Sequence, residues 1–123
     1  MSKIQFEQFE KMMAYDVLKK GVCIEVSFFV DDLPEYNSCW LGKTFNSRTS
    51  KEIYWYGLVK DDSQAYDFES LHDFVNAPVF HGNSIKEIWN LIMLISIDSC
   101  AVEDRLNHYL GLESGSVRRS VST

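Results

Sequence analysis

The chain has few of the residues that stabilise a small extracellular domain. Three of its 123 residues are cysteine, Cys23, Cys39 and Cys100, and no two of them form a C-x-x-C pair. An odd number of widely spaced cysteines is typical of reduced thiols and provides no disulfide framework. The sequence therefore favours a cytoplasmic protein that an apolar core stabilises.

Long hydrophobic runs are also absent. The longest run, Leu91–Ile95, is far shorter than the roughly 20 residues that a transmembrane helix needs. The N-terminal sequence MSKIQFEQFEKMM is interrupted by charged residues and does not have the apolar centre of a signal peptide. We expect no contact with a membrane.

Basic residues are scarce relative to acidic ones. The chain has 12 lysines and arginines against 18 aspartates and glutamates, which gives a formal net charge of −6. A nucleic-acid-binding surface needs clustered lysine and arginine to displace counterions, so this balance argues against nucleic acid as a partner. It is compatible with a basic protein partner, and equally with a role in solubility alone.

The sequence contains no catalytic or cofactor motif: there is no phosphate-binding glycine loop, no G-x-S-x-G and no H-E-x-x-H. The three histidines, His72, His81 and His108, do not have metal-ligand spacing. Cys100 is near a predicted helix start, where a thiol can become nucleophilic, and His81 or His108 could act as its base. Because free cysteine is usually a small core residue, we predict neither an enzyme nor a bound cofactor or metal.

Three runs with the alternating pattern of β-strands follow one another, at residues 22–30, 36–45 and 51–60. In the first, Val22, Ile24, Val26, Phe28 and Val30 alternate with more polar residues. The short polar connections predict an antiparallel meander. Residues 91–97, LIMLISI, are apolar without alternation, which indicates a fourth strand buried on both faces, or else a helix that continues to about Leu94.

The third strand, KEIYWYGLVK, has two apolar faces. Ile53, Trp55 and Val59 lie on one side, and we predict that they build the core. Tyr54 and Tyr56 lie on the other side, where either a helix covers them or they face water. The pattern of residues 36–45 does not decide which of its faces is buried.

Capping residues and apolar spacing predict helices before and after the meander. We expect them at residues 3–20, 70–76, about 84–90 and about 101–110, the last with Asp98 or Ser99 as N-cap, and a short extended piece at 66–68. Together these elements form an α+β fold with one globular domain over residues 1–112. Residues 113–123, ESGSVRRSVST, have little to bury, and we expect them to be disordered.

Acidic residues gather in two of the predicted connections. If consecutive strands pair as hairpins, the first and third connections lie at the same end of the sheet. We name these carboxylates the acidic rim: Asp31, Asp32, Glu35, Asp61 and Asp62. Three interpretations remain open: a docking site for a basic partner, the ordinary polarity of turns, or a Ca²⁺ site, which the absence of an EF-hand spacing disfavours.

Aromatic residues on the second and third strands could lie beside this rim. Tryptophan and tyrosine are enriched at interface hot spots because they combine large rigid area with a polar tip. We therefore predict Trp40, Tyr54 and Tyr56 as anchors for a protein partner. The alternative is that one of the predicted helices covers them.

In size, acidity and aromatic strands, the chain resembles the small immunity proteins with which bacteria neutralise polymorphic toxins. The stretch WYGLVK and the segment FESLHDFVNAPVFHGNSIKEIW also resemble uncharacterised bacterial single-domain families. The resemblance implies a toxin as the partner but assigns no residue a role. The alternative function is a small-molecule-binding domain or small enzyme with a pocket between sheet and helices.

Overall fold

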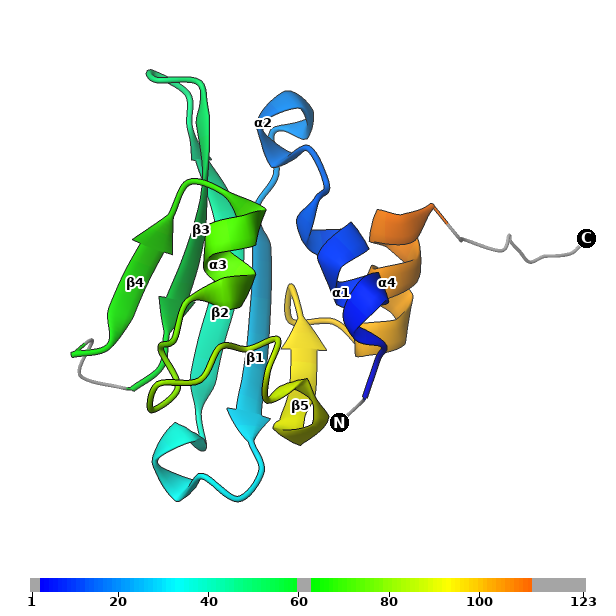
Figure 1. Ribbon diagram of the computed structural model, residues 1–123. Coiled ribbons are helices and arrows are strands. Elements are labelled where there is room, and N and C mark those ends of the chain that lie inside the picture. The colour runs from blue at the N-terminus through cyan, green and yellow to red at the C-terminus, as the bar shows by residue number, and fades with distance from the viewer. Residues whose placement is uncertain (1–2, 60–62, 112–123) are drawn as a thin grey trace, which may run out of the picture.

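The fold is a five-stranded antiparallel sheet with helices, an α+β architecture as predicted (Figure 1). The computed structural model describes residues 3–59 and 63–111. The strands are β1 (Ile24–Val30), β2 (Cys39–Asn46), β3 (Lys51–Gly57), β4 (Ala65–Phe68) and β5 (Ile92–Ile97). Their order across the sheet is β4-β3-β2-β1-β5.

The predicted meander is confirmed, and both additional strands extend it. β4 corresponds to the extended piece expected at residues 66–68 and pairs with β3. β5 corresponds to the apolar run at residues 91–97 and pairs with the free side of β1, so the alternative of a helix in this run is wrong. β2 begins three residues later than expected, because Pro34–Tyr36 form a 3-10 turn, η1, in the preceding connection.

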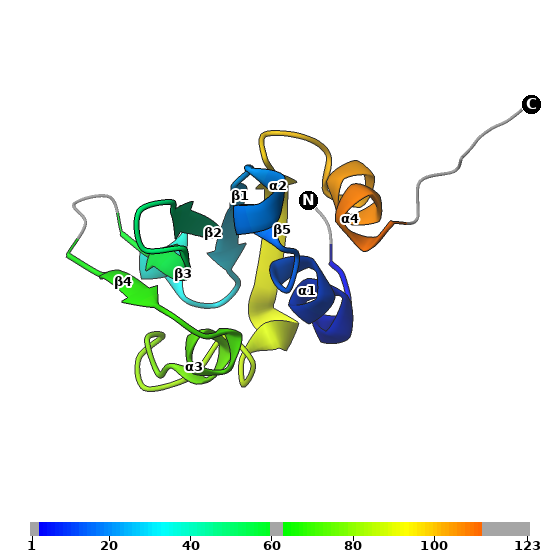
Figure 2. The same cartoon turned by 90° about the horizontal axis from the view of Figure 1, so that it is seen from above.

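Two helices, α1 (Phe6–Met13) and α3 (Leu71–Asn76), lie over one face of the sheet. They are on the same side when the sheet is seen from above (Figure 2). The single turn α2 (Val17–Lys20) contacts β2 and β3, and α4 (Val102–Leu110) packs against α1 and β5. We call the side under α1 and α3 the covered face and the opposite side the open face.

The covered face of β3 is the reverse of the one we predicted. Tyr54, Tyr56 and Leu58 are buried there, whereas Ile53, Trp55 and Val59 are half-buried. Phe74 of α3 explains the choice, because its ring lies 4.3 Å from that of Tyr56 and 5.5 Å from that of Tyr54. On β2 the undecided face is settled as well: Cys39 and Leu41 point into the core.

The Trp55 side chain fits on the open face because the residue opposite it on β2 is glycine. Gly42 pairs with Trp55 in the register of the two strands. A Cβ atom at Gly42 would lie 2.7 Å from Trp55 Cζ2 and 2.2 Å from the carbonyl oxygen of Ile24. The indole therefore uses the space that a side chain would otherwise fill.

The helix predicted for residues 3–20 is wrong, since it is broken into α1 and α2. The side chain of Asp16 caps α2 by accepting a hydrogen bond from the Lys19 amide (2.9 Å). At the break, the buried Lys43 Nζ donates to the carbonyls of Met13 (2.9 Å) and Tyr15 (2.7 Å). The chain turns here because this ammonium binds carbonyls that a continuous helix would use internally.

Glu52 completes the arrangement around Lys43. Its Oε1 lies 3.3 Å from Lys43 Nζ, and its Oε2 accepts a hydrogen bond from the Leu18 amide (3.1 Å). The ammonium also lies 4.8 Å from the centre of the Tyr54 ring. One buried charge thus joins α1, α2, β2 and β3.

Two further local predictions need correction. Ser84 and Glu87 do form reciprocal hydrogen bonds (2.8 and 3.1 Å), but residues 85–88 are a turn that leads into a 3-10 helix, η2 (Trp89–Leu91), in place of the expected α-helix. The N-cap of α4 is Ala101, with no side-chain cap, so neither Asp98 nor Ser99 caps it. Ser70, by contrast, caps α3 as its capping-box spacing predicts.

Asp98 instead connects α4 to the sheet. Its Oδ2 accepts hydrogen bonds from Arg105 Nη2 (2.9 Å) and from the Tyr109 hydroxyl, and its Oδ1 accepts one from the Glu25 amide (2.9 Å). Burial, together with the hydrogen bond to Asp98, raises the pKa of Tyr109 to about 12. The carboxylate holds α4 and the beginning of β1 together.

The N-terminal residues lie along the side of β5 that does not pair with β1. Lys3 Nζ donates to the carbonyls of Ile92 (3.0 Å) and Trp89, and the Trp89 indole Nε1 donates to the Ile4 carbonyl (2.9 Å). The Lys3 ammonium is also 5.6 Å from the centre of the Trp89 ring. These contacts fix residues 3–5 before α1 begins.

We expect Lys43→Met to lower the free energy of unfolding by about 3 kcal/mol, because it leaves two helix-end carbonyls and Glu52 without their donor. Urea denaturation measures the change. Lys51→Met is the matched control, since the Lys51–Glu69 pair is exposed at both ends, and it should change stability by less than about 0.5 kcal/mol. Equal effects of the two variants would contradict the role of Lys43.

Gly42→Ala should destabilise the domain by about 2–3 kcal/mol, because the new methyl group meets the Ile24 carbonyl and displaces Trp55. Gly57→Ala, with nothing within 4 Å of the added Cβ, is the control and should change stability by less than about 1 kcal/mol. Thermal unfolding followed by tryptophan fluorescence reports both. A Gly42→Ala variant as stable as Gly57→Ala would show that Trp55 does not need this space.

Candidate functional site

The described part of the acidic rim lies at one end of the sheet. Asp31, Asp32 and Glu35 are exposed in the connection between β1 and β2. This connection adjoins the one between β3 and β4, because the Tyr36 hydroxyl donates to Gln64 Oε1 (3.1 Å). Hairpin geometry therefore predicted correctly that the two connections meet. Asp61 and Asp62 lie outside the described residues.

The carboxylates of this connection have different surroundings. Glu35 Oε2 lies 2.8 Å from His81 Nε2, and both side chains are about half-exposed. Asp32 adopts a left-handed backbone conformation (φ 67°) in the tight turn that follows β1. Asp31 and Asp32 are exposed to solvent, whereas the Glu35 carboxylate contacts the imidazole of His81.

Two of the three predicted aromatic anchors are not accessible. Tyr54 is 7% exposed and Tyr56 is 1% exposed, because α3 covers both. The Tyr56 hydroxyl donates to the Phe74 carbonyl (2.8 Å), and burial raises the pKa of this tyrosine well above its ordinary value. The two tyrosines are core residues, so the prediction that they anchor a partner is wrong for this structure.

Trp40 is placed as the partner-binding prediction requires. It is 41% exposed on the open face, at the start of β2 and two residues after the acidic connection ends. Phe29 on β1 and Trp55 on β3 are half-buried on the same face. Both lie diagonally from Trp40 in the strand register, within reach of an aromatic ring. We call Phe29, Trp40 and Trp55 the aromatic patch.

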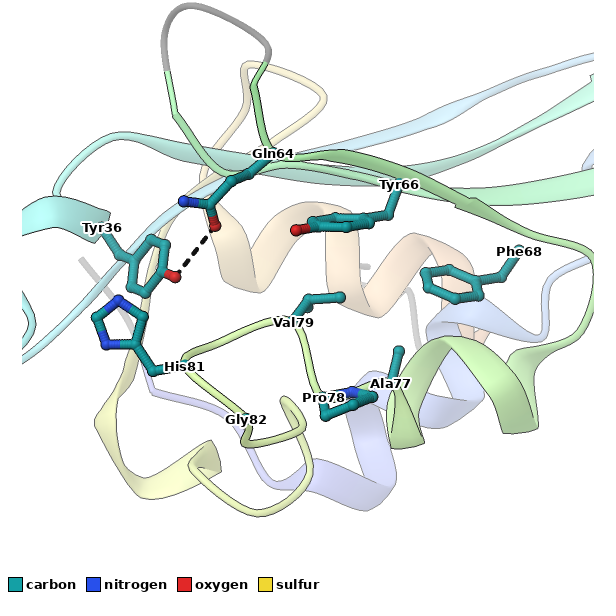
Figure 3. Close-up of a pocket in the computed structure, with 9 residues that line it drawn as sticks. All are labelled: Tyr36, Gln64, Tyr66, Phe68, Ala77, Pro78, Val79, His81 and Gly82. Atoms are coloured by element: carbon teal, nitrogen blue, oxygen red, sulfur yellow. Dashed lines mark hydrogen bonds between the residues drawn. The ribbon is translucent and has the colours of Figure 1, made fainter.

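A groove lies on the covered side of the sheet, along β4. This groove of about 540 Å³ has one wall made of alternate residues, Gln64, Tyr66 and Phe68 (Figure 3). The facing wall consists of Ala77, Pro78 and Val79, from the segment that follows α3. Tyr36 and His81 close the end of the groove nearest the acidic connection.

His81 is held in place by a tight turn. Phe80 and Asn83 exchange two main-chain hydrogen bonds of 3.0 Å, and the two residues between them, His81 (φ 54°) and Gly82 (φ 85°), adopt left-handed conformations. This is the geometry of a two-residue hairpin turn. The turn sets the imidazole 5.1 Å from the Tyr36 ring and against Glu35.

The sequence did not predict the groove. The alternation of Gln64, Tyr66 and Phe68 was the available signal, since it indicates one shared face of a strand. The facing wall has no regular pattern, and its position depends on how α3 and the 80–83 turn pack. The groove is therefore a tertiary feature.

The candidate catalytic residues lie on separate elements. Cys100 is exposed between β5 and α4, and His81 is in the 80–83 turn. His108 is on α4, seven residues beyond its N-cap, which is roughly 10 Å along the helix. The residues that line the groove include one histidine and two tyrosines but no cysteine, serine or threonine.

Residues 3–59 and 63–111 contain neither a candidate metal-ligand group nor a candidate membrane-spanning helix. No three histidine, cysteine, aspartate or glutamate side chains in these ranges are grouped so that they could bind a metal ion. No helix in the same ranges has the length and apolar character needed to cross a bilayer.

Comparisons with protein-family models, with curated proteins and with solved structures found no match to the chain.

The three thiols should differ sharply in reactivity. Cys39 is 1% exposed, and burial raises its pKa to about 12, whereas Cys23 and Cys100 are exposed. At pH 8 the native protein should release two equivalents of thionitrobenzoate from Ellman's reagent rapidly and the third only on unfolding, because the thiolate is the reacting form. Three fast equivalents from the native protein would place Cys39 outside the core.

Proposed function

We propose that this domain is a protein-binding module for a partner with a basic surface. The observation that carries the proposal is the exposed Trp40, which lies on the open face near the end of the sheet from which the connection with Asp31 and Asp32 leaves β1. A large aromatic side chain beside solvent-facing charge is the usual composition of an interface centre and its rim. The proposed contact surface is the aromatic patch together with the connection between β1 and β2.

The two parts of this surface would contribute differently. Burial of Trp40, with Phe29 and Trp55 around it, would supply most of the affinity, because desolvated aromatic side chains dominate binding energies. Asp31 and Asp32 would mainly increase the association rate and select for a partner of opposite charge. The net charge of −6 acts in the same direction at longer range.

Within this class we favour an immunity-type role, in which the domain neutralises a basic toxin in the cytoplasm by covering its working surface. The support is the combination of acidic charge, one exposed tryptophan and the resemblance of the sequence to small bacterial immunity proteins. Neutralisation of this kind requires binding alone, so it is compatible with the absence of a catalytic motif from the sequence.

A small-molecule-binding domain or small enzyme is the second candidate. The observation in its favour is the groove along β4, whose volume of about 540 Å³ lies in the range of ligand sites and which His81 lines. Against it, the groove residues provide an imidazole and a glutamine amide but no hydroxyl or thiol nucleophile other than the tyrosine phenols. The open-face surface is therefore the better-supported site.

Affinity capture with matched variants tests the proposal. Wild-type protein, a Trp40→Ala/Asp31→Asn/Asp32→Asn variant and a Val22→Ala/Asp104→Asn control are immobilised and exposed to extract of the native host. The control removes a carboxylate and another apolar side chain that is 41% exposed, at Val22. We expect a basic protein on the wild type and the control, with affinity for the test variant at least about 30-fold lower.

Salt dependence separates the contribution of the carboxylates. Raising the ionic strength should slow association with the wild type more than with an Asp31→Asn/Asp32→Asn variant, because screening removes long-range attraction. Equal capture by all three proteins contradicts the proposal. A small molecule that shifts the resonances of Tyr66 and Phe68, with no protein captured, would favour the second candidate.

A further inference from the structure

The outer edge of β4 has unused main-chain hydrogen-bonding groups. The Leu58 amide donates to the Gln64 carbonyl (3.1 Å), and this bond continues the ladder of β3 and β4. Because bonded and non-bonded pairs alternate along an antiparallel ladder, Tyr66 and Phe68 are bonded to β3. The amides and carbonyls of Ala65 and Asp67 therefore point away from β3.

These groups lie at the end of the sheet. β4 is the last strand in the order β4-β3-β2-β1-β5, and no described strand lies beyond it (Figure 2). Ala65 and Asp67 are both exposed. An unpaired row of donors and acceptors is a template for one more strand.

The groove lies beside the outer edge of β4, where it could receive side chains of an added strand. Tyr66 and Phe68 project from β4 into the groove, and Pro78 and Val79 face them (Figure 3). A strand added about 4.8 Å from β4 would direct every second side chain to the same side as Tyr66 and Phe68. Those side chains would enter an apolar channel that already runs parallel to the strand.

Carboxylates predominate among the described charged side chains around this edge. Asp67 is exposed on the opposite side of β4 from the groove, and Glu35 lies beside His81 at the end of the groove. Glu69 follows β4 and pairs with Lys51 (3.2 Å). The side chains of an added strand that do not enter the groove would meet Asp67, so this edge favours lysine or arginine at those positions.

We propose that β4 accepts an extended segment of a partner protein as a sixth strand. Apolar side chains at alternate positions of the segment enter the groove, and basic side chains between them face Asp67. Addition of a strand to a sheet edge is a recurring mode of peptide recognition, in which main-chain bonds give affinity and side-chain pockets give selectivity. This site uses neither Trp40 nor Asp31 and Asp32, so it does not depend on the function proposed above.

The test uses the synthetic peptide Ac-Lys-Val-Lys-Val-Lys-NH2 and the full chain labelled with ¹³C and ¹⁵N. We expect the amide signals of Ala65 and Asp67, and the side-chain signals of Tyr66, Phe68 and Val79, to shift together on titration. Two control peptides are matched in length: one with glutamate for lysine, and one N-methylated at every residue, which cannot donate to the edge in either strand orientation. Both should bind at least about tenfold more weakly.

A substitution on the protein tests the same bonds. Ala65→Pro removes one outward-facing donor without removing a bond to β3, and proline is tolerated at such edge positions. It should weaken binding of the lysine peptide about tenfold, whereas Ala65→Ser should leave it unchanged. Because Ala65→Pro could disturb the fold, circular dichroism and the thermal midpoint are measured for each variant, and the N-methylated peptide gives an arm that needs no variant.

Several outcomes would overturn the inference. The first is the absence of shifts at roughly 1 mM lysine peptide. The second is an N-methylated peptide that binds as tightly as the lysine peptide. The third is a set of shifts confined to the groove side chains, which would indicate a small-molecule site instead. Shifts of Ala65 and Asp67 that grow with protein concentration alone would assign the edge to a second copy of the chain. Trp40→Ala should bind the peptide like the wild type, so a failure here is distinguishable from a failure of the proposed function.

Discussion

The buried ammonium of Lys43 is the interaction on which the arrangement of helices and sheet depends. A charge in this position is tolerated because two main-chain carbonyls, Glu52 and the face of the Tyr54 ring surround it. The carbonyls belong to the end of α1 and the residues just after it, so the same contacts determine where the helix ends. The position of α1, against which α4 packs, follows from these contacts. A polar residue in the core thus specifies the geometry of the helical layer, while the surrounding apolar residues supply most of its stability.

Most of the strands could be predicted from the sequence, because alternation is a local property. The direction in which a strand faces is not local. On β3, tyrosines and a tryptophan give both faces comparable apolar area, and the choice between them depends on Phe74 in α3 and on the space above Gly42. The break between α1 and α2 depends on a lysine that follows Tyr15 by 28 residues. No periodicity within the helical stretch could have indicated it.

The candidate site shows the same division. That the first and third connections lie at the same end of the sheet followed from hairpin geometry, and Trp40 is exposed, while its role as an anchor stays a prediction. Tyr54 and Tyr56 failed as anchors because the capping residues predict that α3 exists but not which face it covers. Only the strand wall of the groove has a signal in the sequence, since the other wall is an irregular segment that tertiary packing places against β4.

The two edge strands of the sheet, β4 and β5, are covered to different extents. At β5, Lys3 binds the outward carbonyl of Ile92 and α4 packs alongside, whereas at β4 the outward groups of Ala65 and Asp67 face solvent within the described chain. A sheet with two open edges can add copies of itself without limit and grow into a filament. A sheet with one open edge can accept a single strand or pair with a single copy, after which no further edge is offered. Because Lys3 and α4 occupy part of the β5 edge, the addition of a further strand to this sheet is favoured at β4.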